Sequence, residues 1–373
     1  MDRRSVFLGG ASAAALGGIG VAAQAAAPVR IGQSLPITGP LGAVVKPIAE
    51  GQRVLIDDIN AKGGVRGAPV ELITLDDAAD PQKTLDNTRR LLDTEQVTAL
   101  FGYAFVPGLA RALPLVNERR VPLIGIYNGA DAVRSPANPY VYTTTASLRD
   151  EVAAMVRTLA TLNSRKLALV YQNNELGRYM QPIVEALVKE QGSELVCTVP
   201  AEPDGSNGPA AVQTVAAQHP QAILLLVAGA ALLSFMKALP VEGRVPVYAL
   251  SLAGSSAAIE QMGPAARGMA FTQVVPYPAR PASALTRRFA ALMSKAQLTP
   301  TYDRLWGFLN ASVLVEVLRR APANPAPAQV VATLDHGGEI DLGGYRLSYG
   351  AQRHHGSSFV DITMVDGNGK FIR

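Results

Sequence analysis

The sequence has little of several features that mark particular protein classes. Its 373 residues include one cysteine, so no disulfide can form within the chain. Only 17% of the residues are charged and 48% are hydrophobic, which excludes a disordered chain and predicts a sizeable core. The net charge is +4, aromatic residues make up 6%, and basic residues form no run of five or more, so no nucleic-acid-binding surface is expected.

Motifs of catalysis and metal binding are also missing. The four histidines, at positions 219, 336, 354 and 355, show none of the spacings typical of metal ligands. Neither a P-loop nor a G-x-S-x-G motif after a strand occurs. Cys197 lies within an apolar segment that is predicted to be a strand, where a buried, unreactive thiol is expected. The sequence therefore predicts no catalytic residue, no metal site and no cofactor.

Residues 1–25 are typical of an export signal. Arg3 and Arg4 precede a weakly apolar run that is rich in glycine and alanine, and Ala23-Gln24-Ala25 supplies the small residues that a signal peptidase needs, so we expect cleavage after Ala25. The paired arginines resemble a twin-arginine signal, with an ordinary secretory signal as the alternative. No later stretch reaches the ~18 uninterrupted apolar residues of a membrane span, so the mature protein is expected to be exported and soluble.

Short apolar segments alternate with helical patterns from residue 28 onward. Two sets of segments have the composition of strands that are buried on both faces: 29–35, 70–75, 97–102 and 121–127, then 167–171, 194–199, 223–227 and 245–250. Helices are expected between them, the second opening at Asp80-Pro81 as N-cap and first helical residue. This alternation predicts an α/β fold with two doubly wound parallel-sheet lobes.

Helices near 178–191, 207–218 and 230–239 are expected between the strands of the second set. The C-terminal part departs from this alternation, with helices expected near 282–296, 302–320 and 326–334. The last residues, 359–365 and 370–372, flank Asp366-Gly367-Asn368-Gly369 and predict a closing hairpin with a tight turn.

Three blocks resemble a known family. LPITGP at 35–40, DDINAKGGVRG at 57–67 and DDAADP at 76–81 are similar to the leucine/isoleucine/valine-type solute-binding proteins of ABC transporters. The resemblance implies the type I periplasmic binding fold, in which two lobes are joined by three crossover strands and close on a ligand. The crossovers would lie near 142–147, 271–277 and 339–345. Lobe one would then comprise 28–143 plus 276–338, and lobe two 146–272 plus 343–373.

Ligands of open parallel α/β sheets bind outside the carboxyl ends of the strands, where helix N-termini present unpaired N–H groups. The candidate ligand-binding residues lie in these loops and first helical turns: Val44, Tyr103, Ala104, Phe105, Val106, Tyr127, Asn128, Gly129, Ala130, Leu176, Gly229 and Ser251. We expect the rings of Tyr103 and Tyr127 to face the cleft, with packing in the core as the alternative. Asp76, Asp77 and Asp80 are better explained by helix capping and solvation at a strand end.

The sequence departs from the family at the ligand positions. In amino-acid binders, the residues that hold the ligand carboxylate correspond to Val106 and Gly129, the acid that pairs with the ammonium corresponds to Ser251, and a cleft tyrosine corresponds to Leu176. A shift of one or two positions would bring Asp131 into consideration. The resemblance therefore implies a small organic acid, an aromatic acid, an amide or an atypical amino acid, with the N–H groups of residues 128–130 available to an anion.

The resemblance also implies a function. The protein would be the periplasmic, monomeric substrate-binding subunit of an ABC importer, with a small-molecule ligand and a membrane permease as partners and no enzymatic activity. A ligand-sensing protein that feeds a membrane receptor and an exported α/β enzyme are the alternatives. Neighbouring ATPase and permease genes would favour the first, and turnover of a cleft ligand would favour the enzyme.

Overall fold

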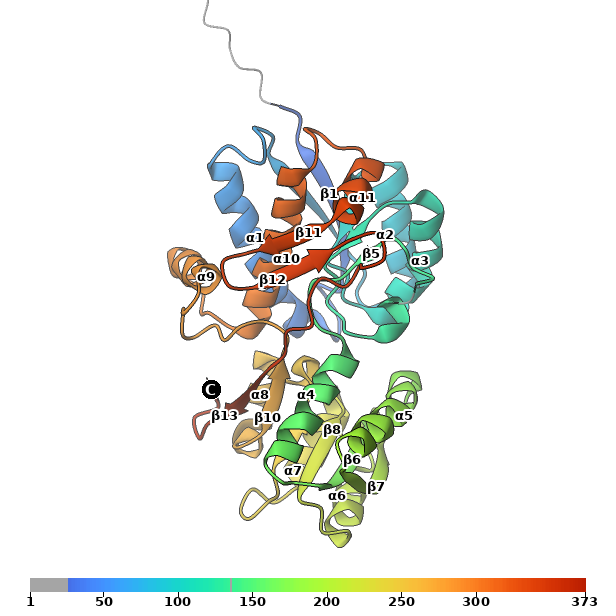
Figure 1. Cartoon of the computed structure of the whole chain (residues 1–373), viewed down its shortest axis with the longest axis vertical. Helices are drawn as coiled ribbons and strands as arrows, with labels where there is room; N and C mark the ends of the chain where they lie inside the picture. The colour runs from blue at the N-terminus through green and yellow to red at the C-terminus, as the bar shows by residue number, and fades with distance from the viewer. Residues whose placement is uncertain (1–25, 135) are drawn as a thin grey trace, which may run out of the picture.

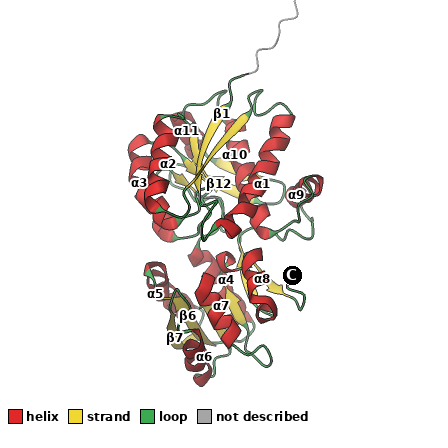
Figure 2. Ribbon diagram, turned by 180° about the vertical axis from the view of Figure 1, so that it is seen from behind, coloured by secondary structure: helices red, strands yellow, loops and turns green. Residues whose placement is uncertain are grey.

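The computed structural model describes residues 26–134 and 136–373, so the predicted signal with Arg3 and Arg4 lies outside the described residues. These residues form two α/β lobes that lie end to end along the long axis of the molecule (Figure 1). Helices cover both faces of the sheet in each lobe, as continuous apolar strands require (Figure 2). None of the described helices is long and apolar enough to cross a membrane.

Lobe one contains a parallel sheet in the order β2-β1-β3-β4-β5. Its strands are β1 (Val29–Leu35), β2 (Val70–Asp76), β3 (Ala99–Phe101), β4 (Leu123–Ile124) and β5 (Val141–Tyr142). Its helices are α1 (Gly42–Ala61), α2 (Pro81–Asp93), α3 (Val106–Arg119), α9 (Ala284–Lys295), α10 (Tyr302–Arg320) and α11 (Pro327–His336). Because side chains alternate along a strand, Phe101 packs with the core under α1 and α10, while Leu100 packs with the core under α2 and α3.

Lobe two contains a larger sheet in the order β14-β13-β10-β9-β8-β6-β7. Its parallel strands are β6 (Lys166–Gln172), β7 (Glu194–Ala201), β8 (Ala222–Leu226), β9 (Val247–Ala249) and β10 (Ala270–Gln273), and β13 (Asp361–Val365) and β14 (Phe371–Ile372) add the predicted antiparallel hairpin. Its helices are α4 (Leu148–Thr161), α5 (Glu175–Glu190), α6 (Gly208–Ala217), α7 (Gly229–Ala238) and α8 (Ser256–Met262). Lobe two also contains the 3-10 turns η2 (Ser251–Ala253) and η3 (Gly263–Ala266). In lobe one, the 3-10 turn η1 (Asp131–Arg134) follows β4.

The third crossover differs from the expectation. Residues 339–345 belong to a two-stranded hairpin, β11 (Gly338–Asp341) and β12 (Arg346–Tyr349), which packs on lobe one. The reason is the turn between the strands, where Asp341 Oδ1 accepts hydrogen bonds from the N–H groups of Gly343 and Gly344, whose φ angles are 88° and 107°. The chain therefore enters lobe two later, at β13, and the expected start of this part of lobe two at residue 343 is corrected.

Tyrosine hydroxyls tie the crossovers together. The hydroxyl of Tyr345 donates to the carbonyl oxygens of Thr144 in the first crossover, at 3.0 Å, and Val274 in the second, at 3.2 Å. Tyr349 donates to the carbonyl of Thr143 at 2.9 Å. Both rings are buried, so these bonds satisfy backbone carbonyls that water does not reach. The hairpin of lobe one thereby fixes the two other connections between the lobes.

Local predictions are confirmed for the most part. Asp80 caps α2 by accepting from the N–H groups of Gln82 and Lys83. Asp76 instead holds the loop after β1, since it accepts from the N–H groups of residues 37 and 38. The expectation of a buried Cys197 is too strong, because β7 is the edge strand of its sheet and leaves the thiol half-buried; burial still raises its pKa.

The hydrogen bonds of Tyr345 to the two connections between the lobes, here called the hinge bonds, lead to a stability prediction. Tyr345→Phe leaves the carbonyls of Thr144 and Val274 without this donor, so we expect the free energy of unfolding to fall by about 1–3 kcal/mol. Urea unfolding measures the change. Tyr179→Phe, at a tyrosine of α5 that is 47% exposed, is the control and should change little. Equal stabilities of Tyr345→Phe and the unaltered protein would show that these bonds do not stabilise the hinge.

Candidate functional site

A cleft of about 440 Å³ lies between the lobes, outside the carboxyl ends of the strands. Lobe one contributes the first turns of α1 and α3, the loop after β4 and the start of α10, while lobe two contributes the loop after β8, η2 and α8. The predicted residues that line it are Val44, Ala104, Phe105, Val106, Tyr127, Asn128, Gly229 and Ser251. The structure thus brings together side chains that the sequence spreads over about 200 positions, and their contact with a ligand stays a prediction.

Tyr103 lies elsewhere than expected. Its ring is 1% exposed and packs in the core under α2 and α3, with its hydroxyl 2.9 Å from Thr88 Oγ1. Gly102, at a φ of 65°, turns the chain directly after β3, so the alternation of the strand does not extend to Tyr103. The alternative, packing in the core, is therefore correct for this tyrosine.

Three further predicted residues lie outside the lining of the cleft. Gly129 packs against the start of α4, where its carbonyl accepts from the N–H of Leu148 at 2.9 Å. Ala130 is 1% exposed, and its N–H donates to Asn128 Oδ1 at 2.6 Å, so this N–H is not available to an anion. Leu176 is half-buried in the first turn of α5, against the core of lobe two.

The cleft is rich in helix N-termini that carry no side-chain cap. In the described residues, α1, α3 and α7 have neither a capping side-chain hydrogen bond nor an acidic residue in the first turn. Other helices are capped, for example α2 by Asp80, α5 by Asn174 and α10 by Thr301. In α1 the N–H groups of Gly42 and Val44 donate to the carbonyls of Gly39 and Leu41, and Pro107 of α3 has no N–H. The positive ends of the helix dipoles, with the remaining N–H groups, favour a bound anion.

Unpaired polar atoms of the lining support the same chemistry. Gln273 Nε2 and Trp306 Nε1 are buried and have no hydrogen-bond partner among the described residues. Each can donate a hydrogen bond, and a buried donor without a partner is unfavourable unless a ligand or water satisfies it. These donors were not singled out from the sequence, although Gln273 is a polar residue at the end of buried strand β10, at the start of a crossover, which was a usable signal.

Tyr127 and Trp306 form an aromatic wall of the cleft. Their rings meet edge to face with centroids 5.6 Å apart. The hydroxyl of Tyr127 accepts a hydrogen bond from Gln52 Nε2 at 2.8 Å. Burial raises the pKa of Tyr127, and the bond from Gln52 opposes this shift, so the phenol stays neutral at physiological pH. Unlike Tyr103, this tyrosine lies where the sequence predicts it.

Two carboxylates lie near the cleft, and both are already bonded. Asp303, the acidic residue among the described lining residues, accepts from the N–H and the hydroxyl of Ser256, both at 3.1 Å. Burial raises the pKa of Asp303, and the bonds from Ser256 oppose this shift. This contact joins α10 of lobe one to α8 of lobe two. The second carboxylate, Glu151, is 1% exposed and lies behind Ser251.

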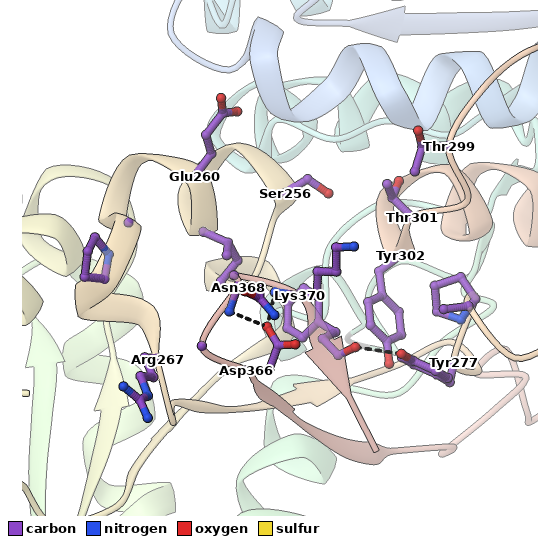
Figure 3. A pocket seen from close by; sticks show the side chains of 18 of the residues that line it. Ser256, Glu260, Arg267, Tyr277, Thr299, Thr301, Tyr302, Asp366, Asn368 and Lys370 are labelled. Atoms are coloured by element: carbon purple, nitrogen blue, oxygen red, sulfur yellow. Dashed lines mark hydrogen bonds between the residues drawn. The ribbon is translucent and has the colours of Figure 1, made fainter.

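A larger cavity of about 1050 Å³ lies along the other flank of α8 (Figure 3). Lobe one and the second crossover supply Thr299, Thr301, Tyr302 and Tyr277, and the turn of the closing hairpin supplies Asp366 and Lys370. The hydroxyl of Tyr277 donates to the carbonyl of Phe371 at 2.6 Å, and Asp366 accepts from backbone N–H groups of its own turn. The helices that begin there, α8 and α10, are capped by Ser255 and Thr301.

Comparison with known proteins agrees with this geometry. Leu/Ile/Val-binding protein homolog 7 of Brucella abortus is 30% identical over 185 residues, which are 47% of this chain and 46% of the relative. The chain spans about half the length of the curated relatives it matches.

Solved structures share the whole fold. An extracellular ligand-binding receptor from Verminephrobacter eiseniae is 27% identical with a TM-score of 0.84, covering 93% of this chain and 100% of that one. A Rhodopseudomonas palustris solute-binding protein in complex with 3,4-dihydroxybenzoic acid is 20% identical, with a TM-score of 0.77 over 91% of this chain and 93% of that one. A Thermus thermophilus branched-chain amino acid ABC transporter protein with bound valine is 18% identical, with a TM-score of 0.80, covering 92% of this chain and 94% of that one.

The family is shown by a match that extends over nearly the whole described chain. Residues 28–370 match a family model described as periplasmic binding protein. This range includes every strand except β14, the three connections between the lobes and every residue of the cleft named above. The chain belongs to the periplasmic binding protein family.

Proposed function

We propose that this protein is the periplasmic substrate-binding subunit of an ABC importer, which captures a small organic anion between its lobes and delivers it to a membrane permease. The observation that carries the proposal is the cleft itself, whose walls come from both lobes and present three uncapped helix N-termini. A ligand that contacts both walls favours the closed form, and the permease would recognise that form. The predicted export signal with Arg3 and Arg4 belongs to this proposal.

The proposed ligand is a small carboxylic acid with an apolar or aromatic body. Its carboxylate would bind at the first turns of α1 and α3, and its body would contact Tyr127, Trp306 and Phe105. Asp303 is engaged by Ser256, so it is not free to pair with a ligand ammonium. Both 3,4-dihydroxybenzoic acid and valine, bound by the proteins of similar fold, are small carboxylic acids.

Other functions use the same cleft in different ways. A sensor that feeds a membrane receptor would bind the same class of ligand, and co-purification with a permease would distinguish the importer from it. We propose no catalytic step and no cofactor, because solute-binding proteins of this family hold their ligand unchanged.

A thermal-shift screen tests the proposed ligand class. Benzoate, 4-hydroxybenzoate, L-valine and L-leucine are compared with benzamide and benzyl alcohol, which lack the carboxylate. A ligand present at 100 times its Kd stabilises the folded state by about 2.7 kcal/mol, so an acid that binds should raise the Tm by several degrees. Shifts that are as large for the uncharged analogues, or shifts for neither group, would contradict a site for anions.

The two tyrosines give a matched pair of variants. Tyr127→Ala should weaken binding of the tightest acid by about 1–3 kcal/mol, because it removes an aromatic contact of the cleft. Tyr103→Ala should lower the free energy of unfolding by about 3–5 kcal/mol and leave affinity nearly unchanged in the folded fraction. Calorimetric titration and urea unfolding measure the two effects. The reverse pattern would place the ligand against Tyr103 and contradict the proposed cleft.

A further inference from the structure

Ser251 presents an unusual arrangement at the wall of lobe two. It lines the cleft at the end of β9 and is 9% exposed. Its N–H donates to Glu151 Oε2 at 2.8 Å, and its hydroxyl donates to Glu151 Oε1 at 3.0 Å. Both hydrogens that Ser251 can offer therefore point away from the cleft, into lobe two.

Glu151 accepts three hydrogen bonds inside lobe two. Three donors converge on its two oxygens, because the hydroxyl of Thr272 on β10 donates as well. Glu151 lies in the first turn of α4, where the helix dipole favours negative charge, and the positive charge of buried Arg134 acts in the same direction. Burial raises the pKa of Glu151, and the bonds from Thr272 and Ser251 and the charge of Arg134 oppose this shift.

The consequence concerns the oxygen of Ser251. A serine hydroxyl has one hydrogen and two lone pairs, and here the hydrogen is committed to Glu151, so only a lone pair remains for the cleft. We infer that Glu151 is a positioning residue that makes Ser251 an obligate acceptor, and that the solute therefore carries a hydrogen-bond donor, a hydroxyl or an ammonium, in addition to its carboxylate. This inference rests on the proposed function and narrows its ligand class.

The geometry also accounts for the missing acid of the ligand site. The residue that pairs with a ligand ammonium in amino-acid binders corresponds to Ser251, and here the negative charge lies one hydrogen bond behind it, on α4. A solute that turned an acceptor toward Ser251 would place two oxygens with lone pairs against each other in a buried site, which leaves both unsatisfied.

Matched probes test the inference on the unaltered protein. The first pair is 4-hydroxybenzoate and 4-fluorobenzoate, which are similar in size and differ in the donor. The second pair is L-valine and 3-methyl-2-oxobutanoate, in which a carbonyl acceptor replaces the ammonium donor. We expect the donor-bearing member of the pair that binds to have at least a tenfold lower Kd, measured by calorimetric titration.

Variants show whether Glu151 sets this preference. Glu151→Gln keeps the side-chain size, and its amide can accept from the N–H of Ser251 while donating to the hydroxyl, which frees the serine hydrogen for the cleft. The preference should then move toward 3-methyl-2-oxobutanoate or 4-fluorobenzoate. Ser251→Ala removes the acceptor oxygen itself, so it should abolish the preference while disturbing the surroundings of Glu151 less than Glu151→Gln does. This variant therefore tests the inference even if Glu151→Gln does not fold. Glu185→Gln, at an exposed glutamate of α5, is the control and should keep it.

The outcomes separate the inference from the proposed function. If the acceptor-only member of a pair binds as tightly as its partner, or Ser251→Ala keeps the preference, the inference is wrong while a site for anions remains. If no acid of either pair binds, both the inference and the proposed ligand class are contradicted.

Discussion

Buried tyrosine hydroxyls of the lobe-one hairpin hold the first two connections between the lobes together. Tyr345 joins the carbonyls of Thr144 and Val274, and Tyr349 holds that of Thr143, so the connections between the lobes are fixed side by side. Because all of these groups are buried, the bonds are protected from water. The chain segments that join the lobes therefore run next to one another.

The two walls of the cleft differ in chemistry. Lobe one supplies the N-termini of α1 and α3, which have no side-chain cap, together with the aromatic pair of Tyr127 and Trp306, and these suit the carboxylate and body of a small acid. Lobe two supplies an oxygen of Ser251 whose hydrogen is held by Glu151. A solute with complementary groups at two positions is bound by both lobes at once, and this double contact couples recognition to closure.

The sequence predicts the fold well because the strands are apolar on both faces and the helices begin and end at recognisable residues such as Asp80. It misplaces the third crossover, since the hairpin turn at Gly343 and Gly344 depends on packing that no local pattern reveals. At the site, strand-end loops are predictable, but the side on which a loop tyrosine lies is not: positive-φ glycines follow both β3 and β4, and Tyr103 comes one residue after its glycine whereas Tyr127 comes two after. The role proposed for Glu151 is not predictable, because it lies 100 residues from Ser251.

We propose that the ligand binds in the cleft between the first turns of α1 and α3 and the wall of Ser251. A crystal structure of the protein with the tightest-binding acid tests this placement. We expect density for the carboxylate at the helix N-termini of lobe one and for a donor group within hydrogen-bond distance of Ser251 Oγ. Density in the larger cavity on the other flank of α8, or contact with one lobe alone, would contradict it.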